Sequence, residues 1–179
     1  MKNIFAHKRN IILIIALILG IAGFFLLSTL LKTSDVIENF EKYRARDWAY
    51  YANRGDVDAQ YNYGECYFNG FGLERDYEQA VHWFTKAAEQ EHIIAQFRLG
   101  WCYFDGYGVE QNIEQGFFWT IKSAEQGYVE AQFWLGASYY YGNIPDVYDY
   151  EQAVYWLEKA AEQGYEPAIT RLKRIREVN

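Results

Sequence analysis

The fold is decided by the stretch Ala95-Gln96-Phe97-Arg98-Leu99-Gly100-Trp101-Cys102-Tyr103, because variants of it occur on both sides. The pattern also begins at Ala59 and at Ala131, which lie 36 residues before and after Ala95. A further alanine, Ala168, comes 37 residues after Ala131. A fixed period of this length is the signature of a solenoid of stacked helical units.

Each unit resolves into two predicted helices. In the first, Ala95, Leu99, Cys102 and Tyr103 form one apolar stripe at helical spacing. Gly106 and Gly108 then mark the end of this helix. Asn112 is suited to cap the start of the second helix, and Asp76 and Asp149 hold the same place in the other two repeats. The second helix carries a tryptophan and a pair of small residues, where two helix backbones can approach closely: Trp83 with Ala87-Ala88, Trp119 with Ser123-Ala124, and Trp156 with Ala160-Ala161.

The combined pattern Leu-Gly-x-x-Tyr, Gly-x-Gly-Val, Ala-x-x-Trp-x-x-x-Ala-Ala closely resembles the Sel1-like repeat, a relative of the tetratricopeptide repeat. The resemblance covers about two-thirds of the chain, and it implies an all-α, α/α superhelical solenoid used as a protein-binding scaffold. Four features depart from the pattern: Tyr63 in place of leucine, Glu91 in place of the closing glycine, Gly116 in place of alanine, and a loop with Pro145 in place of Gly-x-Gly.

The same register divides the chain into segments. Three helix pairs are predicted over 56–92, 93–128 and 129–165. Residues 32–55 are interpreted as a capping helix, a degenerate half-repeat, because Gly55 precedes Ala59 as Gly127 precedes Ala131. Residues 166–179 are predicted to form a C-terminal capping helix with a polar outer face, since a solenoid needs its end faces covered.

The N-terminal segment predicts a membrane anchor. After a short basic tail, residues 1–10, the run Ile11 to Leu31 contains 21 residues without a charge, about 31 Å of helix. A cleaved signal peptide is the alternative, but its apolar region is usually shorter, about 7–15 residues. Lys2, Lys8 and Arg9 favour a cytoplasmic N-terminus. We therefore expect a single-pass inner-membrane protein whose repeats lie in the periplasm.

Charge narrows the class of partner. The chain has 17 Lys and Arg residues against 24 Asp and Glu residues, a formal net charge of −7. Nucleic acids and anionic lipids need phosphate neutralisation, so an acidic repeat surface argues against either of them as its ligand. It is compatible with a basic protein partner or simply with solubility.

The sequence offers no arrangement of catalytic or metal-ligating residues. Cys66 and Cys102 occupy equivalent positions in successive repeats, where stacked helices lie ~8–10 Å apart, beyond the reach of a disulfide. We expect two buried thiols. His82 and His92 lie ten residues apart, which is no metal-ligand spacing. We therefore expect neither an enzyme nor a cofactor.

A candidate binding surface is predicted from positions that the repeat does not demand. On the predicted first helices, the third, sixth and tenth residues after the opening alanine lie away from the apolar stripe, on the expected concave side. Exposed Trp, Tyr and Arg residues there are typical of binding hot spots, although the same rings could instead pack between helices. We refer to this set as the first-helix face: Asn62, Glu65, Arg98, Trp101, Asp105, Trp134 and Tyr141.

These observations predict a membrane-anchored scaffold or adaptor that holds another protein in the groove of the solenoid. Two alternatives stay open at this point. The chain could be an immunity protein that caps a toxic effector, for which an acidic face would suit a basic toxin. It could also be an envelope glycan-binding module, since exposed aromatic rings stack on sugars.

Overall fold

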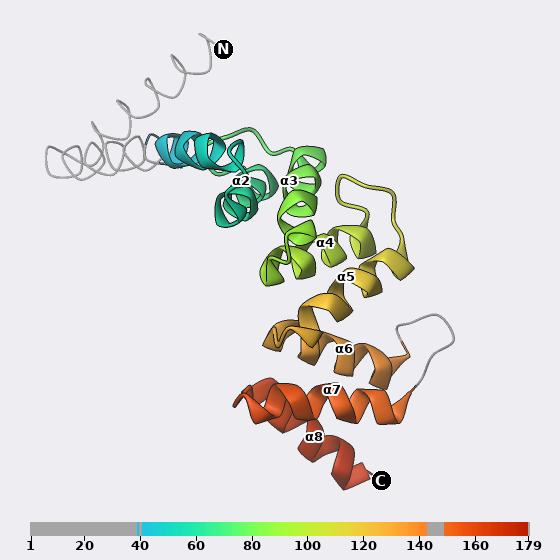
Figure 1. The fold of residues 1–179 in the computed structure, drawn as a ribbon. Coiled ribbons are helices and arrows are strands. Elements are labelled where there is room, and N and C mark those ends of the chain that lie inside the picture. Colours follow the sequence, from blue (N-terminus) through green and yellow to red (C-terminus); the bar gives the residue numbers. More distant parts are fainter. Residues whose placement is uncertain (1–38, 40, 143–148, 179) are drawn as a thin grey trace, which may run out of the picture.

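The computed structural model describes residues 39, 41–142 and 149–178, which are arranged as a helical solenoid (Figure 1). The first described helix covers residues 41–52, and we call it the N-terminal helix. Seven helices of 13 residues come after it: α2 (Val57–Asn69), α3 (Tyr77–Glu89), α4 (Ile93–Asp105), α5 (Ile113–Glu125), α6 (Val129–Tyr141), α7 (Tyr150–Glu162) and α8 (Glu166–Val178). The predicted all-α solenoid is confirmed.

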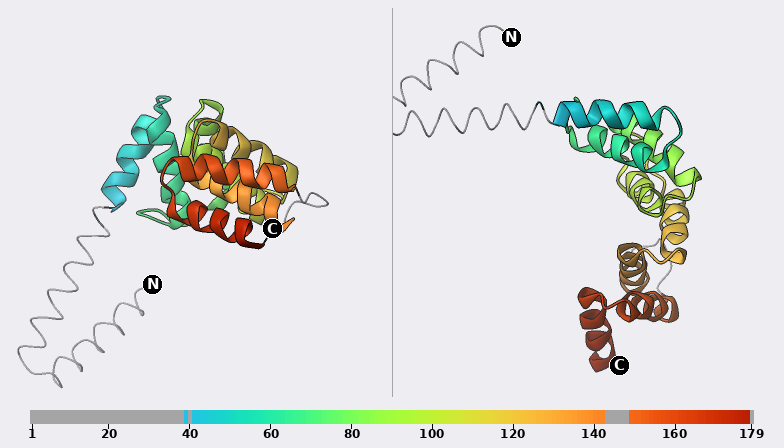
Figure 2. Two further views of the ribbon diagram at one scale, coloured as in Figure 1. Left: turned by 90° about the horizontal axis from the view of Figure 1, so that it is seen from below. Right: turned by 60° about the vertical axis from the view of Figure 1, so that its left-hand side comes forward.

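The helices pack in chain order along an arc. Each contacts the next, and the pairs α2–α3, α4–α5 and α6–α7 make the most extensive contacts. In the right panel of Figure 2, α6 and α8 lie toward the inner side of the arc and α5 and α7 toward its outer side. Close approach within a pair depends on small residues: a Cβ atom on Gly100 would lie 2.9 Å from the carbonyl oxygen of Gly116.

The predicted helix ends are confirmed by their capping contacts. Second helices begin after Asp76, Asn112 and Asp149, whose side chains accept hydrogen bonds from the backbone N–H three residues later. First helices end at glycines in the left-handed conformation: Gly70, Gly106 and Gly142. Glu91, which replaces the closing glycine of the first repeat, adopts a left-handed φ of 66° despite its side chain.

A buried glutamine after each opening alanine connects three helices, and this role is not evident from the sequence. Gln96 is 1% exposed; its amide nitrogen donates to the carbonyl oxygen of Ala88 at 3.3 Å. Its amide oxygen accepts from Gln126 Nε2 at 2.7 Å. The other repeats make the same contacts through Gln60 with Ala52 and Gln90, and through Gln132 with Ala124 and Gln163. Each glutamine therefore links the end of the second helix of the preceding repeat to the end of the second helix of its own repeat.

The N-terminal helix occupies the place of a second helix. A Cβ atom on Gly72 would lie 2.4 Å from the carbonyl oxygen of Glu41, and one on Gly108 would lie 2.1 Å from that of Tyr77. The loop after α2 thus packs on the start of the N-terminal helix as the loop after α4 packs on the start of α3. No described helix precedes the N-terminal helix to cover its other side, as α2 covers α3. At the opposite end, α8 buries Ala168 and Ile175 against the last repeat.

The predicted tail 1–10, the predicted membrane helix 11–31 and the loop that carries Pro145 lie outside the described residues. Among the helices that the structure describes, none combines the length and the apolar character needed to cross a bilayer.

The cap of α4 predicts a pH-dependent stability. His92 Nδ1 accepts from the N–H of Ala95 at 3.0 Å, and Nε2 lies 3.4 Å from an Asp58 carboxylate oxygen. Burial lowers the pKa of His92 from 6.5, and Asp58 acts in the opposite direction. Protonation then favours the unfolded chain, so this contribution to stability is complete above pH ~6.5 and is lost as the pH falls through the folded-state pKa.

We expect His92→Asn to weaken the pH dependence of the free energy of unfolding below pH ~6.5, because an amide oxygen caps the helix without titrating. Denaturant melts of the wild type and the variant between pH 5 and pH 8 measure this difference. An unchanged pH slope in the variant would mean that other groups are responsible.

Candidate functional site

Two residues of the first-helix face form an ion pair between successive first helices. Arg98 Nε on α4 lies 2.8 Å from Glu65 Oε1 on α2, and an Arg98 terminal nitrogen donates to Glu65 Oε2 at 3.3 Å. The Glu65 side chain is 18% exposed and that of Arg98 is 39% exposed. This pair links α2 and α4 on this face.

The middle of the face carries an accessible aromatic ring. Trp101 is 41% exposed, and its indole N–H donates to an Asp105 carboxylate oxygen at 2.7 Å. The hydrogen bond joins two residues one helical turn apart and holds the indole against the surface of α4. An exposed, oriented tryptophan is the kind of side chain that anchors protein interfaces.

Trp134 is half-buried and is not among the exposed aromatic residues of the described chain, so it offers less surface than the pattern predicts. Its ring stacks on Phe104 with centroids 4.4 Å apart and lies 5.4 Å from the ring of Phe117. These contacts place it in the packing between α4, α5 and α6. The alternative that such rings pack between helices therefore applies to Trp134, whose ring contacts the rings of Phe104 and Phe117.

The two ends of the face differ. At the C-terminal end Tyr141 is 55% exposed and its hydroxyl is hydrogen-bonded to Arg171 of α8. At the N-terminal end Asn62 donates to the carbonyl oxygen of Asp58 at 2.7 Å. Asn62 and Glu65 there line a cavity, whereas Trp101 and Tyr141 lie outside its wall. The predicted residues therefore lie along the first helices, and only those at the N-terminal end belong to the cavity wall.

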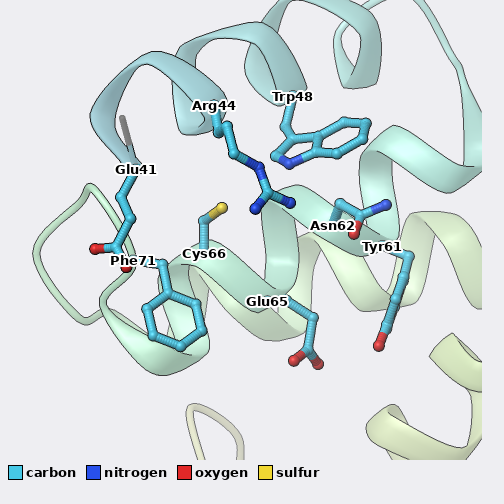
Figure 3. A pocket seen from close by; sticks show the side chains of 8 residues that line it. All are labelled: Glu41, Arg44, Trp48, Tyr61, Asn62, Glu65, Cys66 and Phe71. Carbon is cyan, nitrogen blue, oxygen red and sulfur yellow. The ribbon is translucent and has the colours of Figure 1, made fainter. Parts of the chain in front are cut away.

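That cavity, the N-terminal cavity, has a volume of about 310 Å³ and lies between the N-terminal helix and α2 (Figure 3). The N-terminal helix contributes Glu41, Arg44 and Trp48, while α2 and its following loop contribute the remaining lining residues, Tyr61, Asn62, Glu65, Cys66 and Phe71. In Figure 3 the side chains of Arg44 and Trp48 extend toward those of α2.

The cavity exists because the stack has no described helix at this position. One repeat later α2 covers the equivalent surface, where Phe68 packs on Phe84 and on Tyr107 with centroids 6.1 and 5.7 Å apart. Trp48 and Phe71 are the residues 36 positions before Phe84 and Tyr107. Phe71 is accordingly 51% exposed. The cavity is thus a helix-binding surface of the solenoid that remains uncovered by the described chain.

Its chemistry suits recognition of another molecule. The wall combines the aromatic rings of Trp48, Tyr61 and Phe71 with the charged groups of Glu41, Arg44 and Glu65. Burial raises the pKa of the Tyr61 phenol, and the Glu65 carboxylate raises it further. Tyr61 therefore stays a neutral hydrogen-bonding group at physiological pH. Within the described ranges, no three His, Cys, Asp or Glu residues are grouped so as to hold a metal ion.

The two cysteines are free and buried, which confirms the predicted thiols. Cys66 lines the cavity, whereas Cys102, its equivalent, lies in the core between the first two repeats. Burial raises the pKa of both thiols, that of Cys102 to about 12. Since only the thiolate reacts, both should be slow at neutral pH and faster as the pH rises.

We expect a small thiol reagent to modify Cys66 at least tenfold faster than Cys102 in the native protein, because access and thiolate fraction both favour Cys66. Mass spectrometry of a labelling time course at pH 7 and pH 9 measures the two rates. Equal rates would indicate that modification occurs through unfolding and that the cavity does not admit the reagent.

Of the residues predicted for the first-helix face, Asn62 and Glu65 line the cavity. The other lining residues were not in the predicted set: Glu41, Arg44, Trp48, Tyr61, Cys66 and Phe71. The available signal was the register: residues 41–52 lie one period before the second helix of the first repeat. Their lining role becomes evident only when the helix that would cover them is recognised as absent from the described stack.

Comparison with known proteins agrees with this geometry. The family model of the Sel1 repeat matches residues 57–92, 93–128 and 129–165, more than half of the chain. A sel1-like repeat-containing protein, L18, of Acanthamoeba polyphaga mimivirus is 39% identical over 41 residues, which are 23% of this chain and 7% of that protein.

Two crystal structures have similar folds. The protein c5321, a protective antigen of uropathogenic Escherichia coli with an SLR fold, is 34% identical with a TM-score of 0.70, over 75% of this chain and 29% of that one. A Sel1 repeat protein from Oxalobacter formigenes is 36% identical with a TM-score of 0.61, over 64% of this chain and 47% of that one.

The chain spans less than half the length of each of these three proteins. The three consecutive matches to the repeat and the shared solenoid are consistent with protein–protein interaction. The chain belongs to the Sel1 repeat family.

Proposed function

We propose that this chain is a membrane-anchored scaffold that holds a partner protein against the first-helix face. The N-terminal cavity takes a large side chain or a helix turn of the partner. The observation that carries the proposal is that cavity: about 310 Å³, lined by three aromatic rings, two carboxylates and the guanidinium of Arg44, on a surface that the solenoid elsewhere covers with a helix.

The chemistry of the face favours a partner with both apolar and charged groups. Glu41 and Glu65 line the cavity together with Arg44, and Glu65 is paired with Arg98. The aromatic rings supply apolar contact area, while the mixed charges of the wall give polar contacts of both signs. The formal net charge of −7 adds a general attraction for a basic partner.

The anchor is proposed from sequence. The uncharged run from Ile11 to Leu31 is long enough to span a bilayer, and the preceding Lys2, Lys8 and Arg9 favour export of the chain beyond that run. The repeats then face the periplasm of a bacterial inner membrane. Protease treatment of spheroplasts tests this: digestion of a C-terminal tag supports export, and protection contradicts it.

A cavity-filling variant tests the binding site. In the full-length tagged chain, Asn62→Trp should fill the cavity and abolish co-purification of the partner found with the wild type. Tyr155→Ala on α7 is the matched control, since Tyr155 is 48% exposed and lies on a second helix. Loss of binding in the control, or retention by Asn62→Trp with an unchanged thermal melt, would overturn the assignment of the site.

The same co-purification separates the alternatives. A scaffold should bring down a resident envelope complex, whereas an immunity protein should bring down one toxin in a stoichiometric ratio. A glycan-binding module should instead bind isolated cell wall without a protein partner.

A further inference from the structure

A second hollow lies beside the N-terminal helix and has a different chemistry. Its volume is about 520 Å³, and it is bounded by the N-terminal helix, α2 and the loop after α2. Five side chains with polar groups line it: Asn39, Lys42, Tyr43 and Arg46, and Tyr63 of α2, whose hydroxyl is hydrogen-bonded to that of Tyr67. Ala49 and Leu73 are among the apolar residues of its wall. We call it the basic hollow.

The charge of the basic hollow is unusual for this chain. No carboxylate is among the described residues that line it, although acidic residues outnumber basic ones over the whole sequence. Lys42 and Arg46 lie four residues apart, so they are neighbours on one side of the helix. The Arg46 guanidinium is 5.2 Å from the centroid of the Tyr43 ring. Two cations, a phenol hydroxyl and a primary amide together suit a phosphate group.

The outward side of the same helix carries exposed aromatic rings. Tyr43 and Tyr50 are 58% and 53% exposed, while Ala45 and Ala52 on the opposite side are buried. The guanidinium of Arg54 lies 3.4 Å from the centroid of the Tyr50 ring. Tyrosine with arginine or lysine is the combination that occupies the headgroup level of a bilayer, where one end of the ring is apolar and the other wet.

We propose that the basic hollow binds the phosphate of an anionic phospholipid headgroup and so lays the N-terminal helix on the membrane surface. The inference rests on the proposed anchor. Leu31 and Tyr43 are 12 residues apart, a span of roughly 18–40 Å depending on conformation. The hollow therefore stays within reach of the surface from which the anchor emerges, and the N-terminal cavity beside it opens next to the membrane.

Spin labelling of the full-length chain in vesicles tests the proposal. Cys66→Ser and Cys102→Ser remove the native thiols, since Ser138 holds the equivalent place in the third repeat. A nitroxide is attached at Tyr50→Cys, and its relaxation by lipid-soluble and water-soluble agents is compared in vesicles of phosphatidylcholine alone and of phosphatidylcholine with phosphatidylglycerol. We expect the label to lie at the headgroup level only in the anionic vesicles.

Two sets of controls give the result its meaning. The double variant Lys42→Gln, Arg46→Gln should lower the ratio of label at the headgroup level to label in water about 30-fold, which is a little over fivefold for each basic residue removed. Lys122→Gln with Lys159→Gln removes the same charge from second helices and should leave the ratio unchanged. A label at Tyr155→Cys, equally exposed on α7, should remain in water.

Each other outcome contradicts the site in a distinguishable way. A label at Gly20→Cys inside the bilayer with position 50 in water would overturn the headgroup site and leave the anchor intact. A label at position 20 in water would contradict the anchor and the headgroup site together. If added inorganic phosphate moves the label at position 50 from the headgroup level of the anionic vesicles into water, the hollow is a site for free anions and not for a lipid.

Discussion

Gly108→Ala should destabilise the solenoid by roughly 3 kcal/mol or more, because a single added methyl group meets backbone atoms. Gly108 has a φ of 67°, a conformation that costs an L-residue about 1–2 kcal/mol. The added Cβ would also lie 2.1 Å from the carbonyl oxygen of Tyr77 and 2.5 Å from the backbone nitrogen of Glu78. These atoms belong to the first turn of α3, so relief requires the loop and the helix to separate.

Gly127→Ala is the matched control. Gly127 has a φ of 93°, but no atom lies within 4 Å of the Cβ position. We expect it to lose only the conformational part, about 1–2 kcal/mol. Denaturant melts of the two variants, monitored by helical circular dichroism, give the difference. Equal losses would mean that the loop yields freely and that its contact with α3 does not hold the repeats together.

Gln96→Leu should cost about 1–3 kcal/mol although leucine is close to glutamine in size. The substitution removes two hydrogen bonds, to the Ala88 carbonyl oxygen and from the Gln126 amide, in a site where Gln96 is 1% exposed. Each such bond contributes about 0.5–1.5 kcal/mol, and the Ala88 oxygen keeps its bond from the Glu91 N–H. The loss should appear as weaker coupling between the first and second repeats, because Ala88 belongs to one and Gln96 to the other.

Gln126→Ala distinguishes the two bonds of this network. Gln126 is exposed and donates to Gln96, so its removal should cost only about 0.5–1 kcal/mol and leave the bond to Ala88 in place. The double variant should be less destabilised than the sum of the single ones. A Gln96→Leu protein as stable as the wild type would show that the glutamine amide is dispensable.

Much of the fold was predictable because each signal is local. Asp76 and Asn112 are side chains that cap helices in any context, and Gly106 supplies a left-handed end. The 36-residue spacing of Ala59, Ala95 and Ala131 then set the order of the stack.

The candidate site was less predictable because it depends on neighbours distant in the sequence. Trp134 sits at a position equivalent to Arg98, yet the rings of Phe104 and Phe117 draw it into the packing. The function of Gln96 could not be inferred either, since glutamine has no strong preference for a buried bridging position. Phe71 fits the repeat pattern but is 51% exposed, more than the 36% of its equivalent Tyr107, because no described helix packs on Phe71 as Phe68 of α2 packs on Tyr107.

The location of the cavity at one end of the stack has a physical reason. Inside a solenoid each unit covers the apolar face of the next, whereas the end units must be covered by other means. At the C-terminal end α8 does this with buried Leu172 and Ile175. At the N-terminal end the described helix 41–52 covers only one side of α2, and Trp48 and Phe71 border the space that remains.

Photocrosslinking in cells tests the central claim most directly, that a partner protein binds the first-helix face at the N-terminal cavity. A photoreactive phenylalanine derivative is placed at Asn62, Phe71 or Trp101 of the full-length chain, and at Phe118 or Tyr155 on second helices. The account predicts one shared crosslinked protein from the first three positions and none of it from the last two. Crosslinking of that protein only from Phe118 and Tyr155 would contradict the account.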